Sequence, residues 1–174
     1  MISNIKNFIV ALFAAMILVT SIGCVTDTQP AQSATNASEI APAAILGMEK
    51  MVVSTGMDAL QRVKRSHTGS IENVEDLAII HYGKDDKLLT LWVTLYQNGT
   101  VARTETERMV IGMRKWGGDW ASTLEEVTID DKVVYRVMVN GEPQYFWADG
   151  RCVLYIIPHN FTHDEISLII KAIP

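Results

Sequence analysis

The sequence predicts an α+β domain with an antiparallel sheet and helices packed on one face of that sheet. Three observations lead to this prediction: apolar runs with strand-like alternation, two dipeptide turns typical of hairpins, and segments with helical spacing of apolar residues. From residue 46 to the end, no low-complexity stretch interrupts these patterns. About 130 residues make one ordinary domain, long enough to bury a core.

The first part of this domain has the order strand, helix, strand, strand, helix. A strand is expected over Met48–Ser54, and a helix with a buried face over 55–67. Two strands, over 75–83 and 87–97, are expected to form a hairpin because a short polar turn separates them. The spacing of alanine, methionine and tryptophan then predicts a second helix over 103–117.

The second part contains strands and one closing helix. Strands are expected over 122–129, 132–139, 143–148 and 152–157. Asn140-Gly141 and Asp149-Gly150 are dipeptides that supply the positive φ angles of tight hairpin turns. Isoleucines at helical spacing predict the last helix, over 162–173. The whole order is ferredoxin-like β-α-β-β-α-β, followed by a β-meander and a C-terminal helix.

Each predicted helix begins with a hydroxyl residue followed three positions later by an acidic one, which is the pattern of a capping box. The three pairs are Thr55 with Asp58, Thr104 with Glu107, and Thr162 with Glu165. These pairs set the expected starts of the helices.

The N-terminus has the order of a secretory signal. Lys6 precedes the apolar run Phe8–Val19, and small and polar residues lead on to Gly23. The tetrapeptide "SIGC", which ends at Cys24, resembles the lipobox of prokaryotic, including archaeal, envelope lipoproteins. This resemblance implies cleavage after residue 23 and a lipid on Cys24. An uncleaved N-terminal helix is the alternative anchor, although twelve apolar residues are short for a membrane span of about 20.

The chain therefore divides into three predicted parts: a signal peptide at 1–23, a lipid-anchored flexible linker at 24–45, and a globular domain at 46–174. The linker prediction follows from composition, since the stretch after Cys24 is rich in Thr, Ser, Gln, Pro and Ala and has no aromatic residue. The expected location is the outer, extracytoplasmic face of the cell membrane, with membrane lipid as the partner of the anchor.

Charge and cysteine content exclude several classes of protein. The chain has 15 Lys and Arg against 20 Asp and Glu, a net charge of −5, which argues against a nucleic-acid partner. With Cys24 lipidated, Cys152 is the remaining thiol, so no intramolecular disulfide and no two-cysteine metal or redox motif can form. We expect Cys152 to be a buried apolar residue of its strand, and we expect no cofactor.

Candidate sites are few. Asn36, Asn98 and Asn160 begin Asn-x-Ser/Thr sequons and are candidate glycosylation sites, although such residues also favour turns and helix starts. His159 and His163 are weak candidates for metal ligands, because a helix that starts near Thr162 would not hold both on one face. We therefore expect no metal site.

The strand over 87–97 offers the one candidate binding surface. Its aliphatic residues fall on one face, whereas Trp92 and Tyr96 share the other face with two threonines. Aromatic residues on the less apolar side of a sheet can bind a sugar, a peptide or a lipid, although most such residues belong to the core.

No catalytic motif is present: the sequence has no GxSxG, HExxH, GxxxxGK[ST] or GxGxxG pattern, and no catalytic residue is assigned. The expected function is a membrane-anchored, non-catalytic domain that binds a ligand or an envelope protein. Two alternatives stay open, an anchored envelope hydrolase and a structural accessory subunit of a membrane complex.

Overall fold

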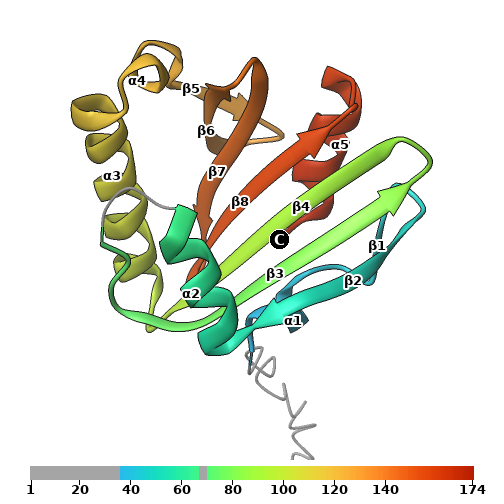
Figure 1. Ribbon diagram of the computed structural model, residues 1–174, viewed down its shortest axis with the longest axis horizontal. Coiled ribbons are helices and arrows are strands. Elements are labelled where there is room, and N and C mark those ends of the chain that lie inside the picture. Colours follow the sequence, from blue (N-terminus) through green and yellow to red (C-terminus); the bar gives the residue numbers. More distant parts are fainter. Residues whose placement is uncertain (1–35, 67–69) are drawn as a thin grey trace, which may run out of the picture. The chain divides into compact units, whose positions relative to one another are not determined.

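The computed structural model describes residues 36–66 and 70–174, and Figure 1 shows the arrangement of their helices and strands. Eight antiparallel strands form one sheet, in the order β1-β2-β3-β4-β8-β7-β6-β5. The strands are β1 (Ala44–Ile45), β2 (Met48–Thr55), β3 (Val74–Lys84), β4 (Lys87–Tyr96), β5 (Glu125–Ile129), β6 (Lys132–Val139), β7 (Glu142–Asp149) and β8 (Cys152–His159). The predicted α+β class with an antiparallel sheet is confirmed.

Five helices accompany the sheet: α1 (Ala37–Ile40), α2 (Gly56–Ser66), α3 (Gly99–Trp116), α4 (Asp119–Thr123) and α5 (His163–Ala172). From β2 to α5 the predicted order of helices and strands is confirmed, apart from the short helix α4, which the sequence analysis did not predict. The capping box of α5 is present as predicted, with Thr162 and Glu165 bonded to each other's backbone N–H.

Helix α3 begins before its predicted start. The side chain of Asn98 accepts hydrogen bonds from the N–H groups of Thr100 and Val101, so Asn98 is the N-cap and the expected box at Thr104 and Glu107 lies inside the helix. An asparagine N-cap needs no acidic residue three positions later. The capping-box pattern therefore identified Thr104 and Glu107, which lie inside the helix, in place of Asn98.

The strand order is not that of the ferredoxin-like arrangement. β2 and β3 flank α2 along the chain but pair directly as antiparallel neighbours, whereas a split β-α-β unit would leave them parallel and separated. The first four strands form one half of the sheet and the last four form the other. β4 and β8 join the two halves at its centre.

The helices cover both faces of the sheet, which corrects the expectation of one covered face. α1 and α5 pack on the face that carries Ile80, Leu91 and Leu154, here called the α5 face. α2 and α3 pack on the opposite face, here called the α2–α3 face. In Figure 1, α2 lies in front of the strands and α5 lies behind them. Alternation along each strand separates the two sets of side chains.

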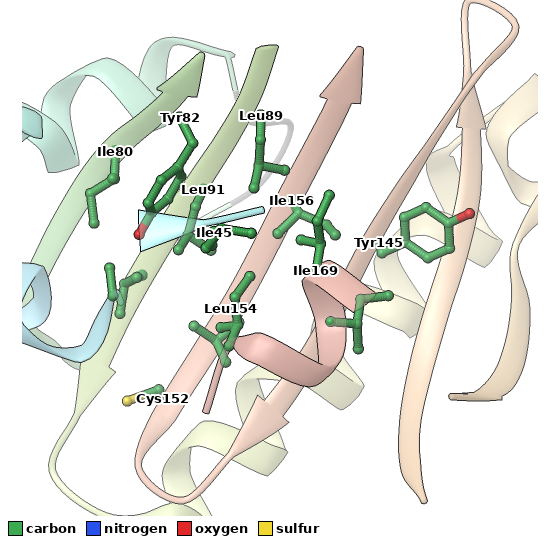
Figure 2. Close-up of a cluster of buried hydrophobic side chains, with 14 of the residues drawn as sticks. Ile45, Ile80, Tyr82, Leu89, Leu91, Tyr145, Cys152, Leu154, Ile156 and Ile169 are labelled. Atoms are coloured by element: carbon green, nitrogen blue, oxygen red, sulfur yellow. The ribbon is translucent and has the colours of Figure 1, made fainter. Parts of the chain in front are cut away.

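The α5 face holds the main core. Figure 2 shows side chains of β3, β4 and β8 meeting Ile169 of α5, and all of these residues are buried. Three isoleucines of α5, at positions 166, 169 and 170, and the C-cap residue Ile173 are 3% exposed or less. Lys132 donates to the carbonyl oxygens of Ile170 and Ile173 and so satisfies the C-terminal end of this helix.

The domain begins earlier than the predicted boundary at residue 46. Ala37, Ala41 and Ile45, which were assigned to the linker, are buried in the main core. The N–H of Ala37 donates to the carboxylate of Asp76 on β3 at 2.7 Å and fixes the start of α1. Small alanine side chains fill this site without the periodic apolar pattern by which sequence analysis recognises a helix. The predicted signal peptide, Cys24 and the linker up to residue 35 lie outside the described residues.

Candidate ligand-binding face

The α2–α3 face is covered only in part. α2 packs against Leu77 and Ile79 of β3, and α3 packs against Tyr96 of β4 and Val153 of β8. Beyond these contacts, towards the β3–β4 turn, the strands carry no helix on this side in Figure 1. We call this region the open face. Its side chains are His81, Leu88, Thr90, Gln144, Ile157 and His159.

A row of four aromatic rings separates the open face from the part covered by helices. Trp92, Tyr155, Phe146 and Tyr135 lie opposite one another on β4, β8, β7 and β6. Successive ring centroids are 5.2, 5.9 and 5.2 Å apart, with interplanar angles of 24° or less. Phe146 is fully buried and the other three are partly exposed. The rings stack on each other, so they stiffen the sheet and present mainly their edges.

Tyr155 carries the row's best-defined polar contact. Its hydroxyl donates to Oε1 of Gln144 at 2.5 Å, which holds the amide of Gln144 on the open face. Burial raises the pKa of Tyr155 to about 12, so the phenol stays protonated and keeps donating at any physiological pH.

The next rows outward mix apolar and hydrogen-bonding groups. His81, Thr90 and Ile157 lie opposite one another on β3, β4 and β8, and all three are partly buried. Further out, Leu88 is 40% exposed and lies opposite His159. An imidazole, a hydroxyl and an amide beside aliphatic side chains can both bury apolar area and form directional hydrogen bonds with a ligand.

At the outer edge, Nδ1 of His159 lies 2.8 Å from Oε1 of Glu142 on β7. Both side chains are about half exposed, so water reaches the pair freely. Within residues 36–66 and 70–174, no hydroxyl group forms a hydrogen bond with His159. The pair can orient an imidazole for ligand binding, but the described residues do not complete a Ser-His-Asp type of arrangement around it.

The structure separates the two aromatic residues that the sequence analysis paired. Trp92 lies in the aromatic row at the boundary of the open face. Tyr96 shares its face but is 5% exposed beneath α3, where burial and the nearby Glu105 carboxylate raise its pKa to about 12. Tyr96 is therefore a core residue. Tyr155 and Gln144 were missed, although the alternation of Tyr155 with buried Leu154 and Ile156 would have placed it on this face.

The histidine pair of the sequence analysis does not come together on a helix. His159 ends β8, whereas His163 is the first residue of α5. In the described parts of the chain, no group of three or more His, Cys, Asp and Glu side chains is arranged to hold a metal ion.

Each sequon asparagine has a local structural role. Asn36 caps α1, and its amide donates to Glu39 at 2.7 Å. Asn98 caps α3, and Asn160 adopts a left-handed backbone with φ 62° while its amide donates to the carbonyl of Asp86. Glycosylation at these positions stays a prediction, and any glycan would attach to residues that organise helix starts and turns.

One hollow of about 230 Å³ lies away from the open face, on the other side of the sheet. The β3–β4 turn, Leu46, Met48 and the start of α5 line it. Lys87 and Glu165 pair across it at 2.5 Å, and hydrogen bonds from Lys87 and from the backbone of Thr162 lower the pKa of Glu165 to about 2. Because these charges neutralise each other, the pair is a structural clamp between β4 and α5.

Cys152 is buried in the main core, and its side chain has 6% exposure. Burial raises the pKa of the thiol, so it is a poor nucleophile, as the strand pattern predicted. Across the last hairpin Asp149 lies opposite Cys152, so the turn consists of Gly150 and Arg151 and not of the dipeptide Asp149-Gly150.

Comparison of the sequence with protein-family models and with curated proteins, and of the structure with solved structures, found no match. Among the described helices, none has the length and apolar character that a membrane span requires.

Proposed function

We propose that this chain is an envelope lipoprotein held on the outer face of the cell membrane by its N-terminus, with a non-catalytic domain that binds a ligand or a protein partner. The observation that carries the binding role is the open face. It combines Leu88 and Ile157 with the hydrogen-bonding groups of His81, Thr90 and Gln144. The order of charged, apolar and small residues before Cys24 supports the anchor.

The binding role is favoured over the hydrolase because of the surroundings of His159. A hydrolytic histidine works beside a positioned nucleophile in a site that excludes water. His159 and Glu142 are instead half exposed at the edge of a sheet. A surface with both apolar and polar side chains also suits the alternative of an accessory subunit, whose partner would be a protein of the same membrane.

The anchor is tested by replacing Cys24 with serine in cells of the source organism. We expect the wild-type chain in the membrane fraction and the Cys24→Ser chain released from it, together with an added lipid mass on the wild-type N-terminal cysteine. Unchanged membrane retention of the variant, without lipid on the wild type, would support the helical anchor instead.

The binding surface is tested by placing a photoreactive amino acid at Thr90 in the anchored chain. A matched probe replaces Met57, which is 66% exposed on α2 and outside the open face. We expect a discrete cross-linked product from position 90 and none from 57. The cross-linked partner is then identified and purified. We expect it to bind the wild-type protein at least about tenfold more tightly than it binds the Ile157→Arg variant, because a charge placed in an apolar contact costs more than about 1.4 kcal/mol of binding free energy. Equal affinity for both proteins would reject the open face as the binding site.

A further inference from the structure

The corner between α3 and α4 exposes two tryptophans. Trp116, the last residue of α3, is 73% exposed, and Trp120 in α4 is 38% exposed. Tryptophan is usually well buried, because it carries the largest apolar surface of any side chain. Two exposed tryptophans separated by one tight turn therefore mark an interaction surface.

The corner is a defined structure. Gly118 has φ 55° and ψ −122°, a backbone conformation that L residues avoid, and it directs the chain sharply from α3 into α4. The N–H of Gly117 donates to the carbonyl of Met113 and closes the end of α3, and that of Trp120 donates to Gly117. Both indole rings are thus carried by hydrogen-bonded backbone and presented at one corner of the domain, where α4 follows α3 in Figure 1.

Positive charge accompanies the two rings. Arg114 and Lys115 are exposed in the last turn of α3, and Nζ of Lys115 lies 4.8 Å from the ring centroid of Trp116. The helix dipole accounts for basic residues at this end of a helix. It does not account for the exposed indoles beside them. The exposed carboxylate of Asp119 in α4 opposes these two cations, so residues 114–120 carry a net charge of +1, whereas the whole chain carries −5.

We propose that this corner, defined by Arg114, Lys115, Trp116 and Trp120, inserts into the headgroup region of an anionic lipid bilayer. Indole rings favour the interface between hydrocarbon and water, and arginine and lysine are attracted to anionic headgroups. The surface consists of a few side chains around one turn, so it suits shallow insertion into lipid. Contact of this kind would orient the domain on the membrane, and it does not depend on whether Cys24 carries a lipid.

The test uses the fluorescence of the chain's own four tryptophans. The full-length protein is reconstituted into phosphatidylcholine vesicles with or without phosphatidylglycerol, both containing brominated phosphatidylcholine as a quencher. We expect quenching in the anionic vesicles that falls to about half or less in the double variant Trp116→Phe/Trp120→Phe, because the remaining Trp92 and Trp147 are partly or fully buried in the domain. Quenching is compared only for protein that floats with the vesicles, so differences between variants report the position of the corner.

A charge-reversal pair provides the matched control. Arg114→Glu/Lys115→Glu is expected to remove the extra quenching in anionic vesicles, whereas the same reversal at Arg62 and Lys64, exposed on α2, is expected to leave it unchanged. Equal effects of the two reversals, or equal quenching in neutral and anionic vesicles, would overturn the proposal. A blue shift of the Trp116 and Trp120 emission with protein concentration in the absence of vesicles would also overturn it, because the corner would then join copies of the chain. Release of the Cys24→Ser protein from membranes is a separate measurement, so failure of the anchor and failure of the corner are distinguishable.

Discussion

The ammonium group of Lys87 lies 2.5 Å from Oε1 of Glu165, and this ion pair joins the first residue of β4 to the first turn of α5. The two residues come from distant parts of the sequence, and each side chain is about one-third exposed. The same carboxylate accepts a hydrogen bond from the N–H of Thr162. Glu165 therefore serves the capping box and the ion pair at once, and protonation would weaken both.

The stability of the domain should depend on the ionisation of Glu165. Its folded pKa is lowered from 4.5 to about 2, so the ionised form stabilises the fold above pH 4.5, and this contribution is lost as the pH falls towards 2. We expect the melting temperature of wild type to fall more steeply between pH 5 and pH 2.5 than that of Glu165→Gln. The control Glu49→Gln, at an exposed carboxylate, should follow wild type. Parallel curves for wild type and Glu165→Gln would contradict the prediction.

Two glycines of α3 should respond oppositely to alanine. A Cβ on Gly99 would lie 2.8 Å from the carbonyl oxygen of Gly150, so Gly99→Ala should lower the free energy of unfolding by about 1–3 kcal/mol. A Cβ on Gly112 would have no atom within 4 Å. Gly112→Ala should therefore raise the free energy of unfolding by about 0.5–1 kcal/mol, because alanine has the higher helix propensity. Urea denaturation measures both values, and a Gly99→Ala protein as stable as wild type or more stable would show that the close approach of Gly99 to Gly150 does not matter.

The cap of α3 should depend on the side chain of Asn98. Asn98→Ala removes the acceptor for two backbone N–H groups and should cost about 1 kcal/mol, whereas Asn98→Asp should retain most of the stability. Thr100→Ala removes the sequon and keeps the cap, so it separates any effect of a glycan from the effect of the cap. Equal unfolding free energies for Asn98→Ala and wild type would place the start of α3 elsewhere.

Cys152 should be unreactive in the folded protein. In the Cys24→Ser chain it is the only thiol, and it is 6% exposed with a raised pKa. We expect iodoacetamide to leave Cys152 unmodified under native conditions at pH 8 and to label it fully in urea, as measured by intact mass. Rapid native labelling would show that the end of β8 opens readily.

The local structure was largely predictable from the sequence. β6 matches its predicted range, and the turn at Asn140 and Gly141 has the positive φ angles that this dipeptide supplies. Alternation and turn residues act over a few positions, so one sequence contains the information they need. α4 was missed because five residues give no helical period.

The arrangement of the strands was not predictable in the same way. Pairing of β4 with β8 brings Trp92 opposite Tyr155, and no local pattern specifies which distant strands meet. The open face follows from this pairing, because Thr90 and Ile157 become neighbours only when β4 and β8 are adjacent. For the same reason, sequence analysis found Trp92 but could not separate it from Tyr96, which α3 covers.

The central position of β8 has a consequence for how the protein is made. During synthesis the N-terminal strands appear first. One edge of β4 then stays unpaired until Cys152–His159, which form β8, have been made. A product truncated before β8 would expose that edge together with Leu89, Leu91 and Val93, which is a template for aggregation. We therefore expect the N-terminal half of the sheet not to be stable by itself, and folding to be completed only when the last strand enters the middle of the sheet.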